Sequence, residues 1–160
     1  MLVLLGLSFF FVLLLSRNMQ ITLHADGGAR GNPGPAGCGY VVSDTTSSAV
    51  KILRKCGNYC GETTNNQAEY QGLIQGLAWI LHNLPTPEKL AIVMDSLLIV
   101  NQVKGIYRVK NAALKSRHQE TMALLSRFPV WGIVHTYRAD NATADSLVNQ
   151  AIDLRREIVA

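Results

Sequence analysis

Few of the 160 residues carry a charge, and the sequence has little cysteine and no internal repeats. Charged residues make up 16% of the chain and hydrophobic residues 48%, a balance that excludes a disordered protein. The three cysteines are odd in number and match neither a disulfide framework nor the spacing of a zinc site, so we expect reduced, structural thiols. A chain of this length fits one domain with its own hydrophobic core.

Long hydrophobic runs are missing except at the N-terminus, where residues 1–15 read MLVLLGLSFFFVLLL, with thirteen apolar residues and no charge. A helix of that length reaches about 22 Å, less than the roughly 30 Å of a membrane core. The following LSRNMQ lacks the small residues of a signal cleavage site. Three interpretations stay open: a translation start at Met19 that makes the run dispensable, a secretory signal, and a membrane anchor.

We therefore treat residues 1–18 as a leader of open status and residues 19–160 as the folded domain. Membrane contact is expected only if the leader is genuine, and a cytoplasmic location is expected otherwise. Nothing in the sequence indicates an obligate protein partner, and a monomer is expected.

Acidic residues are absent between Ser96 and Gln119, although this segment is rich in basic ones. The net charge of +4 and the pI near 9.1 are only weak indications of a polyanionic partner. Two interpretations of the segment stay open: a solvated helix face, and a surface that contacts phosphates. Its basic residues are Lys104, Arg108, Lys110, Lys115 and Arg117.

Hydrophobic periodicity predicts the element order β-β-β-α-β-α-α-β-α. Alternating or β-rich runs predict strands, a recurrence at three and four residues predicts helices, and GNPGPAG (31–37) predicts a turn. Three hairpin strands followed by alternating elements indicate an α/β fold, with a mixed five-stranded sheet and helices on both faces. The predicted strands are 19–26, 38–44, 49–60, 89–95 and 130–137, and the predicted helices are 66–84, 96–104, 111–127 and 142–158.

Four carboxylates stand at the ends of predicted strands or the starts of predicted helices. Asp26 ends the first strand, and Asp95 ends the buried strand KLAIVMD. Glu69 lies in the first turn of the first helix, on the stripe that faces inward, and Asp145 lies in the first turn of the last helix. Because ligands of open α/β sheets bind near the carboxyl ends of strands, these four side chains could converge on one patch.

Each carboxylate also has a purely structural interpretation, which stays open for each one taken singly. Glu69 could complete a capping box with Asn66, Asp95 could cap the next helix, Asp145 could complement a helix N-terminus, and Asp26 could be a turn residue. Taken together, clustered carboxylates require a divalent cation to remain ionised. Oxygen ligands favour Mg²⁺ first and Mn²⁺ second, and two such ions about 3.5–4 Å apart can cleave a phosphodiester.

Four segments of the chain resemble, in order, the signatures of the ribonuclease H type I family. HADGGARGNPGPAGCGYVV (24–42) resembles its opening block, TTNNQAEYQGLIQGL (63–77) its second, and VMDSLLIVNQV (93–103) its third. RADNATADSLVNQA (138–151) matches the closing pattern R-x-x-N-x-x-A-D. Any one of these matches is weak, but together they are highly specific. The resemblance identifies residues 19–160 as a ribonuclease H domain with a ribonuclease H-like fold.

The resemblance implies a function and a site. The family's four catalytic and metal-binding positions correspond to Asp26, Glu69, Asp95 and Asp145, which would bind two Mg²⁺ ions, with Mn²⁺ as a substitute. The implied reaction is hydrolysis of the RNA strand of an RNA–DNA hybrid, leaving 5′-phosphate and 3′-hydroxyl ends. Alternatives are a non-catalytic hybrid-binding module, another nuclease of the same superfamily, and the detached ribonuclease H portion of a reverse transcriptase.

The resemblance also implies where the hybrid would lie. Departures from the family are the missing basic protrusion, replaced by the compact GIYRVKNAALKSRHQ (105–119), and an arginine, Arg138, where many members carry a mobile histidine in this region. We expect His24 and His135 to be ordinary strand residues. The residues predicted to contact nucleic acid are Gly27, Gly28, Asn65, Asn66, Lys104, Arg108, Lys110 and Arg138.

Overall fold

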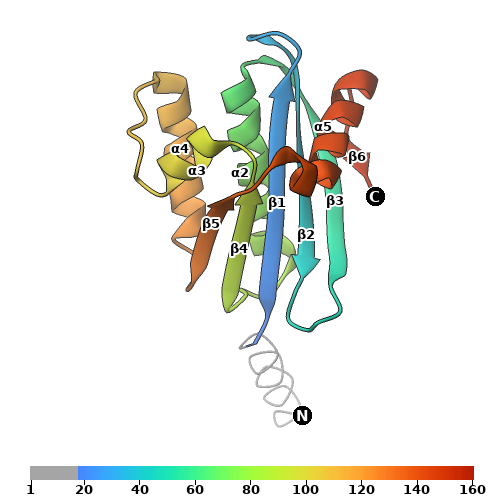
Figure 1. Ribbon diagram of the computed structural model, residues 1–160, viewed down its shortest axis with the longest axis vertical. Coiled ribbons are helices and arrows are strands. Elements are labelled where there is room, and N and C mark those ends of the chain that lie inside the picture. The colour runs from blue at the N-terminus through green and yellow to red at the C-terminus, as the bar shows by residue number, and fades with distance from the viewer. Residues whose placement is uncertain (1–17) are drawn as a thin grey trace, which may run out of the picture.

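The computed structural model describes residues 18–160, which build a six-stranded sheet with helices on its two faces (Figure 1). The interpretations of the leader concern residues outside this described part, apart from Asn18. Within residues 18–160, no helix combines the length and the apolar character that crossing a membrane requires. The strands are β1 (Gln20–Ala29), β2 (Gly34–Asp44), β3 (Lys51–Thr63), β4 (Lys89–Met94), β5 (Trp131–His135) and β6 (Ile158–Val159).

The strand order in the sheet is β5-β4-β1-β2-β3-β6. The first three strands form an antiparallel meander, whereas β4 runs parallel to β1, with Ile21 opposite Leu90. β5 in turn runs parallel to β4, with Ile92 opposite Ile133. The predicted mixed sheet is therefore confirmed, and the carboxyl ends of β1, β4 and β5 meet at one edge.

Helices cover both faces of the sheet, as predicted (Figure 1). Two neighbouring glycines of β1, whose Cβ positions point to opposite faces of the sheet, show which helix covers each face. A Cβ atom on Gly27 would lie 2.1 Å from the carbonyl carbon of Ala68 in α2, whereas one on Gly28 would lie 3.3 Å from Val148 in α5. The helices are α2 (Asn65–Asn83), α3 (Leu97–Val103), α4 (Ala112–Leu125), the 3₁₀ turn η1 (Arg138–Asn141) and α5 (Ala142–Leu154).

The hydrophobic core lies between the sheet and α2, with α3 and α4 beside it. Alternate residues of β1 point into it, as do Leu73 and Leu77 of α2, which recur at helical spacing and are fully buried. Burying a side chain of this size contributes about 1.5–3 kcal/mol. This layer fixes β1, β4 and α2 against one another, and thereby positions Asp26 in β1, Glu69 in α2 and Asp95 directly after β4.

Helix α5 lies on the opposite face, over a floor of glycines. A Cβ atom on Gly39 would lie 2.6 Å from the carbonyl oxygen of Ala144, and one on Gly57 would lie 2.5 Å from that of Leu147. The glycine-rich stretch therefore extends the strands so that α5 can approach them closely. The predicted turn over 31–37 is too long, because β2 already begins at Gly34.

The predicted helix over 142–158 is wrong at its C-terminal end. Helix α5 stops at Leu154 because Arg155 adopts a left-handed conformation, with φ of 50°. Ile158 and Val159 then pair antiparallel with Gly57 and Cys56 of β3. The sheet consequently has six strands instead of the predicted five, and the short β6 protects part of the edge of β3.

Candidate active site with a buried acidic cluster

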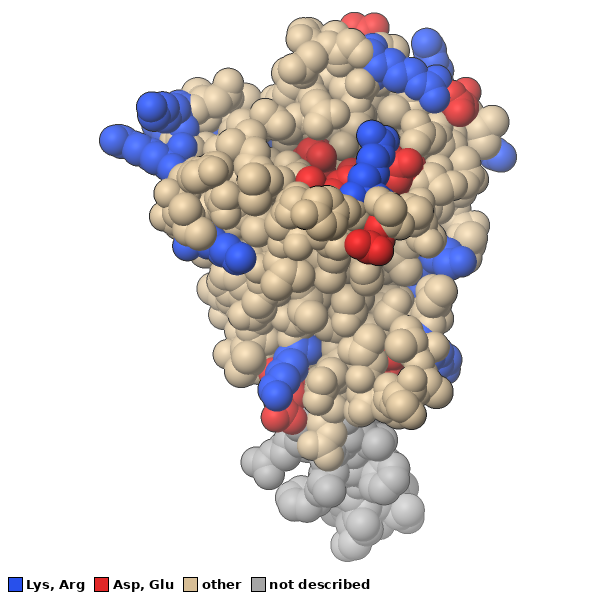
Figure 2. Space-filling view, in the orientation of Figure 1, with Lys and Arg blue, Asp and Glu red and all other residues tan. Residues whose placement is uncertain are grey.

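Three carboxylates converge beside the end of β4, where its parallel pairing with β1 stops and β1 continues to Ala29. One oxygen each of Asp26, Glu69 and Asp95 lies within 4.8 Å of the others, and we call these three residues the acidic trio. They come from β1, α2 and the residue directly after β4. Asp145 lines the same hollow from the first turn of α5. Figure 2 shows the hollow as a patch of red on an otherwise mostly uncharged face.

Burial makes the trio electrostatically costly. Asp26 and Glu69 are only 4% and 6% exposed. Burial first, and then the nearby Asp95 carboxylate, raises the pKa of Asp26 to about 7, although the Gly27 N–H donates to its Oδ1 at 2.8 Å. Burial, followed by the charges of Asp26 and Asp95, raises the pKa of Glu69 well above its ordinary value. The cluster therefore requires protons or a cation in order to be stable.

An orphaned oxygen shows what kind of group fits the hollow. Glu69 Oε2 is buried and accepts no hydrogen bond from any described residue. A buried, charged carboxylate oxygen without a partner is strongly unfavourable, so a proton or a bound cation would be needed to compensate it. An all-oxygen ligand set suits a hard divalent cation such as Mg²⁺ or Mn²⁺. The residues present thus fit a divalent metal site.

The structure removes the capping interpretations of two members of the trio. Helix α2 is capped by Thr64, whose side chain and that of Gln67 form the capping box, so neither Asn66 nor Glu69 takes part in it. Helix α3 is capped by Ser96, which accepts from the Ile99 N–H, and the cap is not Asp95. Asp26 lies within β1 and not in a turn.

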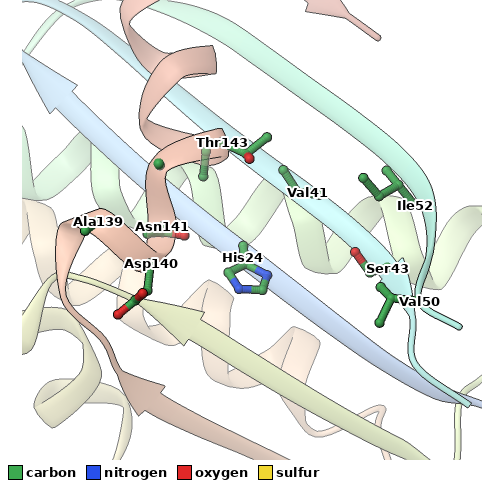
Figure 3. Close-up of a pocket in the computed structure, with 11 residues that line it drawn as sticks. His24, Val41, Ser43, Val50, Ile52, Ala139, Asp140, Asn141 and Thr143 are labelled. Atoms are coloured by element: carbon green, nitrogen blue, oxygen red, sulfur yellow. The ribbon is translucent and has the colours of Figure 1, made fainter. Parts of the chain in front are cut away.

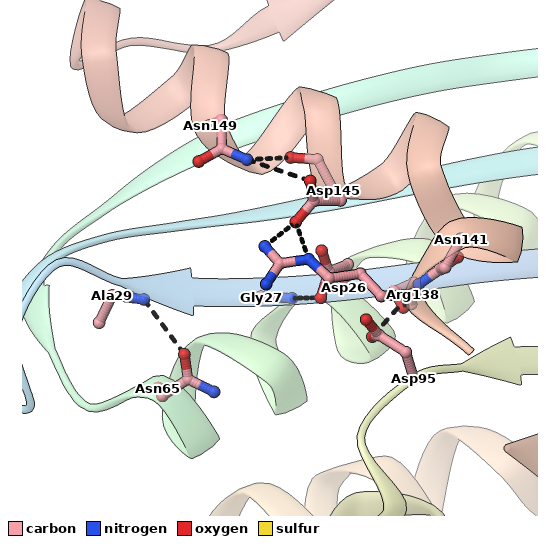
Figure 4. A network of polar contacts seen from close by, with 10 residues as sticks. Asp26, Gly27, Ala29, Asn65, Asp95, Arg138, Asn141, Asp145 and Asn149 are labelled. Atoms are coloured by element: carbon pink, nitrogen blue, oxygen red, sulfur yellow. Dashed lines mark hydrogen bonds and ion pairs between the residues drawn. The ribbon is translucent and has the colours of Figure 1, made fainter. Parts of the chain in front are cut away.

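Both side-chain oxygens of Asp145 accept hydrogen bonds from other residues of the chain (Figure 4). Its Oδ1 accepts from Nε of Arg138 at 3.0 Å and also from Nη2 of the same guanidinium. Its Oδ2 accepts from the side-chain amide of Asn149, one turn further along α5, at 3.2 Å. All four predicted carboxylates therefore line one hollow, but only three of them form the tight cluster.

Two asparagines support the site and were not among the predicted site residues. Asn141, which is 1% exposed, donates through Nδ2 to the carbonyl of Ala25 at 3.0 Å and to Asp95 Oδ1 at 3.5 Å. It thereby ties η1 to β1 beside the trio. Asn149 orients Asp145 as described. Their signals in the sequence were the R-x-x-N spacing and the four-residue step from Asp145 to Asn149.

The residues predicted to contact nucleic acid fall in two places. Gly27, Gly28, Asn65 and Arg138 line the acidic hollow, and Asn65 also accepts from the Ala29 N–H at 3.3 Å. Asn66 is half-buried at the start of α2 and is not among the residues that line the hollow. The exposed basic residues of the connection between α3 and α4, at the left in Figure 1, lie outside the hollow. They are Lys104, Arg108 and Lys110, and their role stays a prediction.

A second hollow on the same face lies beside η1 (Figure 3). It is lined largely by apolar side chains such as Val41 and Ile52, together with His24. Burial lowers the pKa of His24, which favours its neutral form. His24 belongs to β1, as predicted, and it does not line the acidic hollow.

Known proteins share this fold and sequence. Residues 24–151 match the family described as Reverse transcriptase-like. A bifunctional protein of Mycobacterium tuberculosis is 40% identical over 142 residues, which cover 89% of this chain and 38% of that protein. The chain thus spans well under half the length of that relative. A ribonuclease H of Sulfurovum sp. is 32% identical over 140 residues, covering 80% of this chain and 87% of the relative.

Two solved structures extend the likeness to three dimensions. The N-terminal RNase H domain of the M. tuberculosis protein has a TM-score of 0.75 at 40% identity, covering 84% of this chain and 99% of that one. LC11-RNase H1 in complex with an RNA/DNA hybrid has a TM-score of 0.77 at 41% identity, covering 84% and 98%. The resemblance predicted from the four motifs is confirmed, and the chain belongs to the type 1 ribonuclease H family.

Proposed function

We propose that this protein is an endoribonuclease that hydrolyses the RNA strand of RNA–DNA hybrids, with divalent cations as cofactors. The observation that carries the proposal is the acidic trio, three carboxylates whose oxygens lie within 4.8 Å, one of which has an orphaned buried oxygen. A binding module would have no need for such an unfavourable cluster. Family membership and the hybrid bound to LC11-RNase H1 support the choice of substrate.

Asp26, Glu69 and Asp95 would hold the cation, and Asp145 would contribute to a second position. Bound Mg²⁺ or Mn²⁺ supplies an activated water and stabilisation of the leaving oxygen. The chain's own residues place the ligands: the Gly27 N–H fixes Asp26, and the Asn141 amide fixes Asp95. Burial of Asp26 and Glu69 limits the water around them, which strengthens their interaction with any cation. The products would carry 5′-phosphate and 3′-hydroxyl ends.

The hybrid would lie across the acidic hollow. Asn65 and the backbone of Gly28 are at its rim and can approach the RNA strand, whose 2′-hydroxyl distinguishes it from DNA. The exposed Lys104, Arg108 and Lys110 can contact phosphates away from the cleaved bond. These contacts are part of the proposal.

The experiment incubates the full chain with a labelled RNA–DNA hybrid, duplex RNA or duplex DNA, in Mg²⁺, Mn²⁺ or EDTA. Internal cuts confined to the RNA of the hybrid, and abolished by EDTA, are expected. Asp95→Asn is the matched control, because it removes one charge from the trio with little change in shape. Tight hybrid binding without any cleavage by the unmodified chain would contradict the proposal and favour a binding module.

A further inference from the structure

Asp145 differs from the trio in how its oxygens are used. Both are engaged by donors of the chain: Oδ1 by the Arg138 guanidinium and Oδ2 by Asn149. In the trio, by contrast, Glu69 Oε2 has no partner among the described residues. Glu69 thus has an oxygen open toward a cation, whereas Asp145 is already paired with a cationic side chain of the protein.

Arg138 is well placed to exchange partners. It is the first residue of η1, and its side chain is 74% exposed, so solvent and ligands can reach the guanidinium. Figure 4 shows the Arg138 guanidinium reaching Asp145. Arg30 also lines the hollow, but its guanidinium is paired with Asp153. Arg138 is therefore the cationic side chain that neutralises the acidic site itself.

A guanidinium binds phosphate with the same planar fork of donors that it offers a carboxylate. A phosphate of an incoming nucleic-acid strand is negatively charged, so it can replace Asp145 as the partner of the Arg138 guanidinium. Exchange of one anion for the other leaves the guanidinium paired and releases Asp145 into the hollow. The exposed position of Arg138 makes this exchange sterically open.

We infer that Arg138 is an internal counter-ion that withholds Asp145 from metal binding until a substrate phosphate takes its place. This inference rests on the proposed function. It makes Arg138 a positioning residue that couples substrate binding to the fourth metal ligand. The trio accepts a first cation without substrate, whereas a second cation binds tightly only after Arg138 has moved to the phosphate.

The test is a Mn²⁺ titration of the full chain without nucleic acid, followed by the electron paramagnetic resonance of free Mn²⁺. One tight and one weak class of site are expected for the unmodified chain. Arg138→Gln should tighten the weak class about tenfold, because Asp145 is freed. Arg30→Gln removes the same charge from the rim of the hollow and should change the weak class less than twofold. Arg138→Lys keeps the charge, so its Mn²⁺ affinity for the weak class should lie closer to that of the unmodified chain.

Two further arms identify the route. Asp145→Asn should abolish the effect of Arg138→Gln, because the arginine acts through that carboxylate. A hybrid with an unmodified RNA strand, frozen immediately after mixing so that it is still uncut, should tighten the weak class of the unmodified chain and change that of Arg138→Gln little. A thermal melt of each variant checks that it is folded.

The outcomes separate this inference from the function on which it rests. An equal gain from Arg138→Gln and Arg30→Gln, or a gain that survives in Asp145→Asn, would show a general charge effect and overturn the inference. The inference would also be overturned if the unmodified chain cleaved a normal hybrid but Arg138→Gln left the Mn²⁺ affinity of the weak class unchanged. The absence of any bound Mn²⁺ together with no cleavage would overturn the proposed function as well.

Discussion

The two faces of the sheet are covered in different ways. On the face toward α2, large apolar side chains such as Leu73 and Leu77 fill the space between the layers and are fully buried. On the face toward α5, glycines such as Gly39 let the helix backbone approach the strands. Helix α5 packs on β1, β2 and β3, and two hollows lie beside it and η1. The first face holds the fold together and positions the trio, with Glu69 on α2, whereas the second face carries Asp145 and the two hollows.

The largest effect is expected from substitutions in the acidic trio that leave the packing on both faces of the sheet unchanged. Asp26→Asn and Asp95→Asn should each lower the rate of hybrid cleavage at least about 10³-fold, since a lost metal ligand disables the site. Because the change removes a buried or crowded charge, the melting temperature should not fall. Initial cleavage rates and a thermal melt measure both quantities. Near-normal cleavage by either variant would refute the role given to the trio.

A pair of substitutions compares the two faces directly. Leu77→Ala should lower the free energy of unfolding by about 2–5 kcal/mol, the cost of a cavity, while cleavage per folded molecule changes little because Leu77 lies about two turns of α2 away from Glu69. Gly39→Ala should lower stability by about 1–3 kcal/mol through overpacking, and should also slow cleavage because α5 carries Asp145. Urea unfolding and cleavage rates provide the comparison. Equal effects of both variants on cleavage would break the contrast between the faces.

The exposed connection between α3 and α4 belongs to neither face. Replacing Lys104, Arg108 and Lys110 together by Gln should weaken hybrid binding about tenfold, and should flatten its dependence on salt by a slope of roughly 2–3. Binding to a labelled hybrid at several salt concentrations measures this slope. The triple variant Lys51→Gln, Lys55→Gln and Lys89→Gln is a matched control in charge. An unchanged slope would favour the interpretation of this segment as a solvated surface that does not contact phosphates.

A smaller effect is expected in the pH dependence of stability, which tests the burial of Asp26. Its folded pKa is about 7, above the usual 3.8, so the folded state binds more protons than the unfolded state between these values. Without divalent cations, the Asp26 contribution to stability should therefore fall as the pH rises from about 4 to about 7. The difference in melting temperature between the unmodified chain and Asp26→Asn isolates this contribution. A difference that does not vary with pH would contradict it.

Much of the fold followed from the sequence because its signals were local. The stripe of leucines in α2 and the apolar run of β4 define their elements without reference to the rest of the chain. The parallel pairing of β1 and β4 then brings Asp26 and Asp95 together, as predicted, although β1 continues to Ala29 and does not end at Asp26. Whether each of the four carboxylates is catalytic stays a prediction until the variants are measured.

The errors arose where the deciding contact is distant in sequence. The glycines of β2 look like turn residues because nothing nearby shows that α5 packs on them. The sequence around α2 allows two capping patterns, and the structure uses Thr64 and not Asn66. The apolar stripe of α5 continues through Ile158, so periodicity alone could not show that Arg155 ends the helix. The pairing of Arg138 with Asp145 likewise depends on the path of η1 and has no periodic signal.

Cleavage of a labelled RNA–DNA hybrid as a function of Mg²⁺ concentration tests the central claim most directly, with Glu69→Gln beside the unmodified chain. Gln preserves the shape of this buried side chain but removes the charge that its orphaned oxygen places in the trio. The account predicts saturable, Mg²⁺-dependent cleavage of the RNA strand by the unmodified chain and none by Glu69→Gln. Cleavage in EDTA, or equal rates for both proteins, would contradict it.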